Sequence, residues 1–286
     1  MGQIVGAALV SHVPPLVMSE ADRRAMNGGE DFTLLKALED IRRDKLDQLE
    51  ADTIVVFDTH WFTTIEHIIT SHQHRTGLFT SEELPRGMRQ MPYEIVGDPQ
   101  LANSLASLSE GRDDTWITAI DDPHLPIHYP TINLLPSLQR EEAWVSVGVC
   151  QTGQPADFLL LGQLLREAIT GVDRRVILLA SGGLSHRFWP LREFRDHEGS
   201  GLEHIRTEEA RVADQTVIAM LLAGDHQAVL EYMPEFSTHA PEGRFGHYLM
   251  MLGALGGSEC TLPGTQYGDY EAVAGTGQVN IWFDIE

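Results

Sequence analysis

Three short hydrophobic segments, each followed within a few residues by a histidine, constrain this chain more than any other feature of its sequence. They are residues 4–10 with His12, residues 54–58 with His60, and residues 175–180 with His186. Short apolar runs rich in β-branched residues predict buried strands. In an open α/β sheet, ligands and chemistry lie just beyond the carboxyl ends of the strands. One such histidine would be read as a capping or core residue, but three predict a site built from imidazoles.

Amphipathic helices are predicted between these strands. Residues 31–50 and 156–171 carry apolar side chains at the spacing of a helix that packs one face on a sheet. The length of 286 residues is compatible with one large domain or two small ones. Because the chain has no internal repeat, low-complexity tract or linker, we expect one α/β catalytic domain over residues 1–286. We expect its central mixed sheet to be flanked by helices, with the site at the carboxyl ends of the strands.

The composition argues against several classes of protein. A formal net charge of −22 repels nucleic acid and anionic membrane surfaces. No apolar run approaches the roughly 18 residues of a membrane span, and the first residues lack the charged start of a signal peptide. Two cysteines beside 13 histidines suit a reducing compartment better than a disulfide scaffold. We therefore expect a cytoplasmic protein that acts on a small molecule.

Two of the strand-end histidines and a distant glutamate form a candidate metal site. Glu242 lies just before a helix that is predicted over residues 244–255. Two neutral imidazoles and one carboxylate can hold non-haem Fe(II) while leaving positions open for substrate and oxygen. The same set of ligands binds catalytic zinc. His12, His60 and Glu242 are therefore candidate ligands, and their residue types leave both metals open.

Other histidines are candidates for proton transfer. If His186 does not bind the metal, it can act as an acid or a base, because an unperturbed imidazole titrates near neutral pH. His128 lies in a proline-rich loop, where it could be a second such group or could simply bond to the backbone. His124, in the same loop, is better interpreted as structural. Residues 78–91 are irregular, with Pro85 and Gly87 inside the segment and Pro92 directly after it, and they predict a functional loop or lid.

Four blocks of the sequence together resemble a known enzyme family. They are Ser-His12-Val-Pro, Phe-Asp-Thr-His60-Trp, Ser-Gly-Gly-Leu-Ser-His186-Arg-Phe and the closing Gly275-Thr-Gly-Gln-Val-Asn280. From residue 3 to about residue 283 the chain is similar to the class III extradiol ring-cleavage dioxygenases, typified by the β subunit of protocatechuate 4,5-dioxygenase. Within that family it most resembles the 3,4-dihydroxyphenylacetate 2,3-dioxygenase branch.

The resemblance implies a site and a reaction. It implies one Fe(II) held by His12, His60 and Glu242, and a His186 that deprotonates or hydrogen-bonds a catechol. The enzyme would use O2 to cleave the catechol ring and would release a muconic semialdehyde. Many members carry Asp-His-Gly where this chain reads Ile127-His128-Tyr129-Pro130. This difference leaves the role of His128 open, and the substrate could be a catechol, an aminophenol or a hydroxypyridone.

Two further functions compete with this interpretation. A zinc-dependent hydrolase or lyase would use the same ligands, and a related binding protein would keep only the fold. Retention of all four candidate residues argues against the binding protein. A carboxylate on the substrate would need a cation, for which Arg187 and Arg244 are candidates, although both could make structural ion pairs instead. The resemblance also implies a homo-oligomer, either a dimer or a larger assembly.

Overall fold

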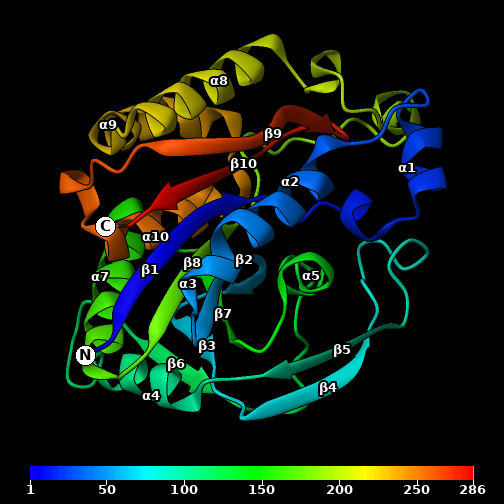
Figure 1. Ribbon diagram of the computed structural model, residues 1–286. Coiled ribbons are helices and arrows are strands. Elements are labelled where there is room, and N and C mark those ends of the chain that lie inside the picture. Colours follow the sequence, from blue (N-terminus) through cyan, green and yellow to red (C-terminus); the bar gives the residue numbers. More distant parts are fainter. Residues whose placement is uncertain (286) are drawn as a thin grey trace.

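A mixed eight-stranded sheet lies at the centre of the computed structural model, which describes residues 1–285 (Figure 1). Its strand order is β6-β3-β7-β2-β8-β1-β10-β9, and β4 and β5 form a separate two-stranded hairpin. The strands are β1 (Gln3–Val10), β2 (Thr53–Thr63), β3 (His67–Thr70), β4 (His74–Phe79), β5 (Met91–Val96), β6 (Ile117–Ile120), β7 (Ala143–Cys150), β8 (Arg175–Ser181), β9 (Gly264–Val273) and β10 (Thr276–Asp284).

Helices cover both faces of the sheet; in Figure 1, α2 lies on one side, and α7 and α10 lie on the other. The α-helices are α1 (Glu20–Met26), α2 (Thr33–Ile41), α3 (Asp47–Leu49), α4 (Pro99–Ser107), α5 (Tyr129–Ile132), α6 (Leu135–Leu138), α7 (Pro155–Gly171), α8 (Glu208–Ala223), α9 (His226–Phe236) and α10 (Gly246–Leu255). Shorter helical turns are η1 (Pro14–Val17), η2 (Arg42–Leu46), η3 (Phe194–His197), η4 (Leu202–His204), η5 (Ser237–His239), η6 (Glu242–Phe245) and η7 (Gly257–Glu259). Within residues 1–285, no helix combines the length and apolar character needed to cross a membrane.

Apolar side chains alternate along the central strands and bury both faces of the sheet. In β2, Val55 and Phe57 belong to the core beneath α7 and α10, whereas Ile54 and Val56 belong to the core beneath α2. Successive strand residues point to opposite faces. The strands β7, β2, β8 and β1 run parallel, which is why they read as continuous hydrophobic runs. The predicted α/β fold, with a mixed sheet flanked by helices, is confirmed.

The helix predicted over residues 31–50 is confirmed over residues 33–49, where the backbone stays helical throughout. It forms α2, the π-helical turn η2 and the single turn α3. The π-helical turn begins at Arg42, a buried residue whose guanidinium donates to the Leu138 carbonyl at 2.9 Å and pairs with Glu142. The local pattern thus predicts the helix correctly, and only the change to π-helical hydrogen bonding at residues 42–46 is not evident from it. The second predicted helix, over residues 156–171, corresponds to α7.

The segment predicted as an irregular loop connects the two strands of a hairpin. β4 and β5 pair antiparallel with Thr76 opposite Glu94. They leave residues 80–90 as a connection, which we call the hairpin loop. Side chains of both strands alternate between more and less exposed positions, so their pattern is weaker than that of the central sheet. The prediction of a loop therefore holds for its middle, while its first and last residues belong to strands.

Candidate metal centre

His60 lies in a bulge of β2 and not beyond the end of the strand. The pairing of β2 with β7 shifts register between Asp58 and Phe62. Asp58 Oδ1 accepts the backbone N–H groups of His60 at 3.0 Å and Trp61 at 3.1 Å. A bulge adds a residue to one strand and turns a side chain to a new direction, often next to an active site. The expectation that the strand ends at residue 58 is therefore wrong, because the bulge lets it continue to Thr63.

The other two candidate ligands are fixed by loops. His12 follows β1, and its carbonyl accepts a hydrogen bond from Asn133 Nδ2 at 2.7 Å. Glu242 is buried at the start of η6, a tight turn in which Arg244 has a φ of 60° and Phe245 a φ of 61°. This left-handed backbone delays the following helix α10 to residue 246, later than the sequence predicts. Both loops lie at the carboxyl-terminal side of their neighbouring strands β1 and β8.

These three side chains converge in space. Glu242 Oε1 lies 3.2 Å from His12 Nε2 and 3.0 Å from His60 Nε2. One ligand atom from each of the three residues lies within 4.8 Å of the others. The second carboxylate oxygen of Glu242 accepts the Gly183 N–H at 2.5 Å, which holds the carboxyl group in place. The structure thus brings together the three residues that the sequence predicts as ligands.

The hydrogen bonds behind the two imidazoles assign their tautomers. Ser181 Oγ donates to the Pro130 carbonyl at 3.0 Å, so it accepts from His12 Nδ1 at 3.1 Å. Glu83 Oε1 accepts from His60 Nδ1 at 2.7 Å. With Nδ1 donating, each ring directs the electron pair of Nε2 toward Glu242. Two nitrogen electron pairs and a carboxylate facing one another call for a cation between them, so the chemistry of this donor set fits a metal.

The electrostatics of the site point the same way. Burial alone would raise the pKa of Glu242, but the neighbouring imidazoles of His12, His186 and His60 outweigh it and hold that pKa well below its usual range. Burial alone would lower the pKa of His60, but hydrogen bonds to Glu242 and Glu83 raise it to about 10. The carboxylate therefore stays ionised, and the site attracts positive charge strongly, whether as a proton or as a metal ion.

His186 lies beside the three ligands without joining them. Its Nε2 is 3.8 Å from Glu242 Oε1. The loops that carry the two residues are joined by a bridge between Ser185 and Pro241 and by hydrogen bonds from the His186 N–H to the Ala240 carbonyl and from the Glu242 N–H to the Leu184 carbonyl. Burial lowers the pKa of His186, which favours the neutral imidazole. This geometry suits a proton acceptor next to a metal.

A buried carboxylate supports the His186 loop. Asp214 of α8 accepts hydrogen bonds from the Ser185 N–H at 2.8 Å, the Ser185 hydroxyl at 2.7 Å and the Tyr270 hydroxyl at 2.6 Å. Burial raises the pKa of Asp214 to about 6. Sequence reasoning missed this residue, because an acidic side chain inside an otherwise ordinary helix carries no local signal of burial.

Tyr129 is a second residue that sequence reasoning missed. Its hydroxyl lies 2.6 Å from His60 Nε2 and donates to Glu83 Oε2 at 3.5 Å. Its neighbour His128 stacks on Trp61 with ring centroids 6.2 Å apart, and His124 is exposed. The proline-rich loop was the available signal, but residue type favours its histidines as candidates, whereas the phenol of Tyr129 is the group that reaches the ligands.

The two candidate substrate arginines are exposed and hold backbone carbonyls. Arg187 donates to the Thr238 carbonyl at 2.7 Å, and Arg244 donates to the Gln151 carbonyl at 2.8 Å. Neither forms an ion pair with a carboxylate among residues 1–285.

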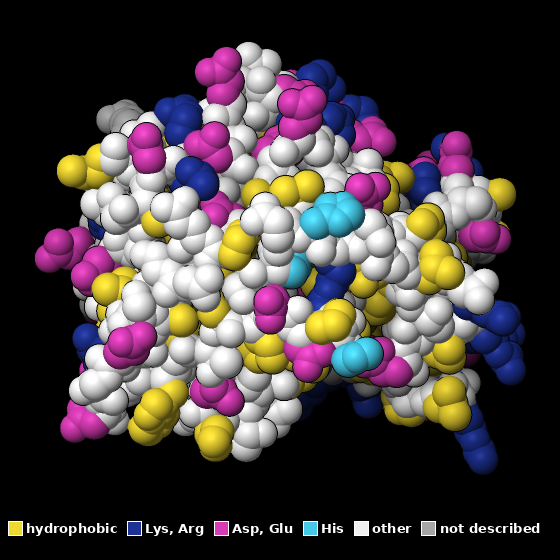
Figure 2. Space-filling view, turned by 90° about the horizontal axis from the view of Figure 1, so that it is seen from below, with side chains coloured by type: hydrophobic (Ala, Val, Ile, Leu, Met, Phe, Trp, Pro, Cys, Tyr) yellow, Lys and Arg dark blue, Asp and Glu magenta, His cyan; other side chains and the backbone are white. Residues whose placement is uncertain are grey.

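Figure 2 shows acidic, basic and apolar side chains mixed over one face, with histidines gathered around a hollow near its middle.

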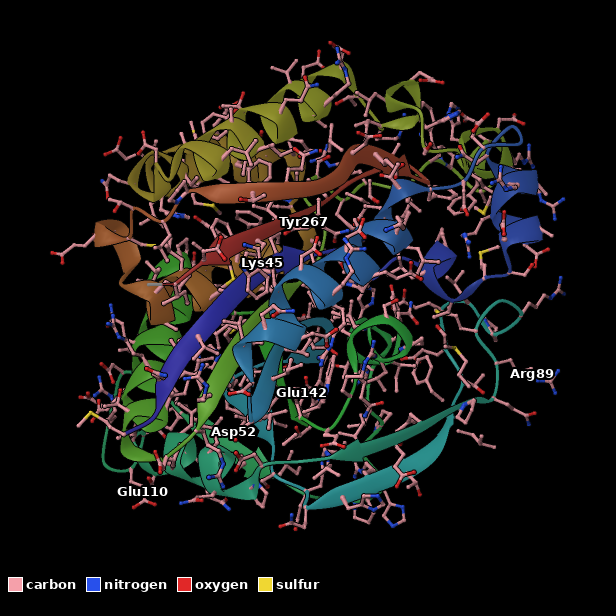
Figure 3. The ribbon with its side chains drawn as sticks, in the orientation of Figure 1. Lys45, Asp52, Arg89, Glu110, Glu142 and Tyr267 are labelled. Carbon is pink, nitrogen blue, oxygen red and sulfur yellow. The ribbon has the colours of Figure 1, made fainter. Side chains whose placement is uncertain are left out.

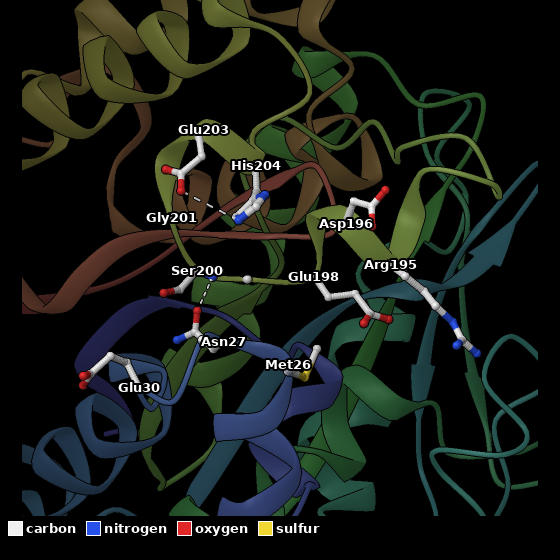
Figure 4. A pocket seen from close by; sticks show the side chains of 12 residues that line it. Met26, Asn27, Glu30, Arg195, Asp196, Glu198, Ser200, Gly201, Glu203 and His204 are labelled. Atoms are coloured by element: carbon white, nitrogen blue, oxygen red, sulfur yellow. Dashed lines mark hydrogen bonds and ion pairs between the residues drawn. The ribbon is translucent and has the colours of Figure 1, made fainter.

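Another cavity lies away from these residues. Its volume is about 380 Å³, and it is lined by the end of α1 and by residues 195–204 (Figure 4). Asn27 Oδ1 accepts the Ser200 N–H at 2.8 Å across it, and Glu203 lies 3.8 Å from His204. Its lining shares no residue with the converging ligands, and it mixes acidic groups with Arg195. We therefore place the candidate site at His12, His60 and Glu242.

Comparisons with known proteins agree with the geometry. The sequence profile described as "Catalytic LigB subunit of aromatic ring-opening dioxygenase" matches residues 6–284. The chain is 30% identical over 262 residues to the 3,4-dihydroxyphenylacetate 2,3-dioxygenase of Escherichia coli, covering 90% of this chain and 91% of that protein. It is 26% identical over 300 residues to the β subunit of a Pseudomonas 2-aminophenol 1,6-dioxygenase, covering 99% and 95%.

Two weaker similarities extend this picture. The α subunit of the Pseudomonas 2-aminophenol 1,6-dioxygenase is 22% identical over 246 residues, covering 85% of this chain and 87% of that subunit. Among solved structures, the uncharacterized protein JW3007 from Escherichia coli K12 superposes with a TM-score of 0.62 at 17% identity, covering 97% of this chain and 99% of that one. At that identity the match speaks to the fold alone.

Proposed function

Because this chain belongs to the LigB family of aromatic ring-opening dioxygenases, and is thus a ring-cleavage dioxygenase, we propose that it is the Fe(II)-dependent extradiol enzyme of a catechol with an acidic side chain. The proposed substrate resembles 3,4-dihydroxyphenylacetate, and the product is a muconic semialdehyde. The observation that carries the proposal is the convergence of His12, His60 and Glu242 within 4.8 Å. Family membership favours this reaction over the zinc-dependent hydrolase and the binding protein.

We assign the metal to His12, His60 and Glu242 because two imidazoles and one carboxylate leave coordination positions free. Bound Fe(II) would coordinate both catechol oxygens and activate O2 at those positions. The side chains of His12, His60 and Glu242 are only 5%, 10% and 4% exposed. Their burial keeps water from competing and orients the ligands before the substrate arrives.

His186 is the residue that we assign to proton transfer. Its side chain is 20% exposed, more than any of the three ligands, so it lies on the accessible side of the site. A neutral imidazole at that place can take the catechol proton and later return it to a leaving oxygen. Burial and the charges of Glu242 and Glu83 raise the pKa of Tyr129, so its hydroxyl stays protonated and can donate a hydrogen bond to the substrate. His128, beside Trp61, is our second candidate acid.

An aminophenol is the second candidate substrate. The similarity to the 2-aminophenol 1,6-dioxygenase β subunit spans 99% of the chain. An aminophenol presents the same pair of adjacent donor atoms as a catechol, so the metal ligands do not discriminate between the two. His186 would have to discriminate between the two substrates, because a neutral aromatic amine gives up a proton much less readily than a phenol does.

The experiment is anaerobic loading of the apoprotein with Fe(II), followed by O2 and a panel of substrates. The panel holds 3,4-dihydroxyphenylacetate, plain catechol and 2-aminophenol, and the readouts are oxygen uptake and a yellow product. We expect uptake and colour with Fe(II), and neither after loading with Zn(II). Fast turnover of 2-aminophenol alone would transfer the assignment to the second candidate. No oxygen uptake with any ring substrate would overturn both.

A cation near the site would account for a preference for acidic catechols. If Arg187 or Arg244 binds the substrate carboxylate, its alanine variant should lose activity on 3,4-dihydroxyphenylacetate more than on plain catechol. A charge-assisted contact is worth about 1.5–3 kcal/mol, so the ratio of kcat/KM values should change by roughly 10- to 100-fold. Arg192→Ala, another exposed arginine of the same segment, is the control. Equal losses on both substrates would assign the two arginines to structure.

We also propose that the protein is a homo-oligomer, most simply a dimer. The chain is similar to both the α and the β subunit of the Pseudomonas enzyme, so a second copy of this chain could occupy the place of the other subunit. Exposed apolar side chains, such as Trp116 at 59% and Ile65 at 73%, offer contact area on an acidic surface. Light scattering at micromolar concentration should give at least twice the mass of one chain. The mass of a single chain would refute this proposal.

A further inference from the structure

We infer that Glu83 is a positioning residue of the metal centre, which fixes the orientation of His60 and joins the hairpin loop to the ligands. The inference rests on the proposed function, because it requires His60 to bind the metal. Glu83 reaches His60 from outside the sheet: it belongs to residues 80–90, whereas His60 belongs to the bulge of β2. The sequence predicts a functional loop over residues 78–91 but does not single out Glu83 within it.

The contact itself has the geometry of an outer carboxylate. Glu83 Oε1 lies 2.7 Å from His60 Nδ1, the ring nitrogen on the far side from Glu242. Its other oxygen accepts the Tyr129 hydroxyl at 3.5 Å. Metal-binding histidines usually donate their second N–H to such a group, which fixes the ring and makes it a better ligand. Glu83 would thus set the direction of His60 and hold Tyr129 beside it.

The hairpin loop is shaped to present this carboxylate. The Ser81 N–H donates to the Met88 carbonyl at 3.0 Å, and the Leu84 N–H donates to Ser81 Oγ at 3.1 Å. Met88 is 1% exposed, whereas Arg89 points away from the body of the protein (Figure 3). The loop is therefore folded on itself and anchored by the buried side chains of Ser81 and Met88, with Glu83 on the part that contacts His60.

The buried Met88 also connects the hairpin loop to the surroundings of His12. Asn133 Nδ2 lies 3.5 Å from Met88 Sδ and donates to the His12 carbonyl at 2.7 Å. The hairpin loop therefore touches the surroundings of both imidazole ligands, directly at His60 and through Asn133 at His12. The Glu83 side chain is 49% exposed, so a modest movement of the loop would break its bond to His60. Occupation of the metal site and the position of the loop should depend on each other.

The test measures metal affinity in the full-length apoprotein. Dissociation constants for Fe(II), determined without oxygen by competition with a chromophoric chelator, are compared for the wild type, Glu83→Ala, Glu83→Gln and Glu82→Ala. We expect Glu83→Ala to bind Fe(II) about 10- to 100-fold more weakly. Glu83→Gln keeps an acceptor oxygen and should lose less. Glu82 is exposed on the same loop, and Glu82→Ala should bind like the wild type.

A second readout reports on the loop. Hydrogen exchange at residues 80–90 should slow when Fe(II) binds to the wild type and should not change in Glu83→Ala. Wild-type affinity in Glu83→Ala, or equal weakening in Glu82→Ala, would overturn the inference. His60→Ala separates this failure from a failure of the ligand assignment. If His60→Ala loses Fe(II) while Glu83→Ala does not, the ligands stand and only the role of Glu83 falls; if His60→Ala binds normally, the ligand set itself is wrong.

Discussion

His60→Ala should lose its iron and, with it, ring cleavage. His60 Nε2 lies 3.0 Å from Glu242 Oε1, and two ligands would remain where three converge. Loss of an outer partner of a ligand typically costs about 10- to 100-fold in metal affinity, so loss of the ligand itself should cost more than about 100-fold. Iron per chain, measured by atomic absorption after gel filtration, and oxygen uptake with 3,4-dihydroxyphenylacetate should fall together.

The control for this variant is a histidine of the same chain without a place in the site. His124 is exposed in the loop before α5, and its side chain lies outside the converging group. His124→Ala should keep its iron and its turnover. If His60→Ala retains normal iron and normal turnover, the assignment of the three ligands is wrong.

His186→Phe should give the opposite result for the metal and a similar loss of rate. The variant should keep its iron, because Nε2 of His186 lies 3.8 Å from Glu242 and outside the three ligand atoms. Without a base, the catechol must lose its proton to water. General acid–base assistance is typically worth about 10²–10⁴ in rate, so we expect turnover at least roughly a hundredfold slower at neutral pH. Iron content and single-turnover rates separate the two effects.

A substrate that is already ionised provides a second test of the role of His186. A nitrocatechol is already ionised near neutral pH, so it needs less help with proton removal and should suffer a smaller loss in the variant. Binding of the nitrocatechol, which its absorbance reports, should persist. If His186→Phe loses its iron, His186 is a ligand and the proposed triad is wrong. If the variant turns over an electron-rich catechol normally, the base lies elsewhere, and His128 becomes the first candidate.

The fold was accessible to sequence reasoning because its strands are buried on both faces. Val55 and Phe57 pack in one apolar core, and Ile54 and Val56 pack in the other. The whole run is therefore hydrophobic and can be recognised as a buried strand. The hairpin strands β4 and β5 are half exposed, and the pattern that would identify them is correspondingly weak. Arg42 shows the other limit, since its buried ion pair with Glu142 and the π-helical turn that begins there have no signal in the local pattern.

The residues of the candidate site likewise fall into those that could be predicted from a local pattern and those that could not. His12 and His186 follow buried strands, and that position can be predicted from a hydrophobic run alone. The bulge at His60 depends on Asp58 accepting two backbone N–H groups, which only the folded chain reveals. Glu83, Tyr129 and Asp214 act through contacts between segments that are distant in the sequence. No spacing pattern records such contacts, so the roles of these individual residues could not be predicted, although Glu83 and Tyr129 lie in loops that the sequence indicates as functional.

β1 finds its neighbours late in the synthesis of the protein. It lies between β8 and β10, so the strand that leads to His12 has no hydrogen-bonded partner until the ribosome has made residues 175–181 and then 276–284. Pairing between such distant segments is slow, and an unpaired apolar strand is open to aggregation meanwhile. Glu242 also emerges more than 180 residues after His60. A metal held by His12, His60 and Glu242, as proposed, would therefore be captured only after at least the first 242 residues have been made.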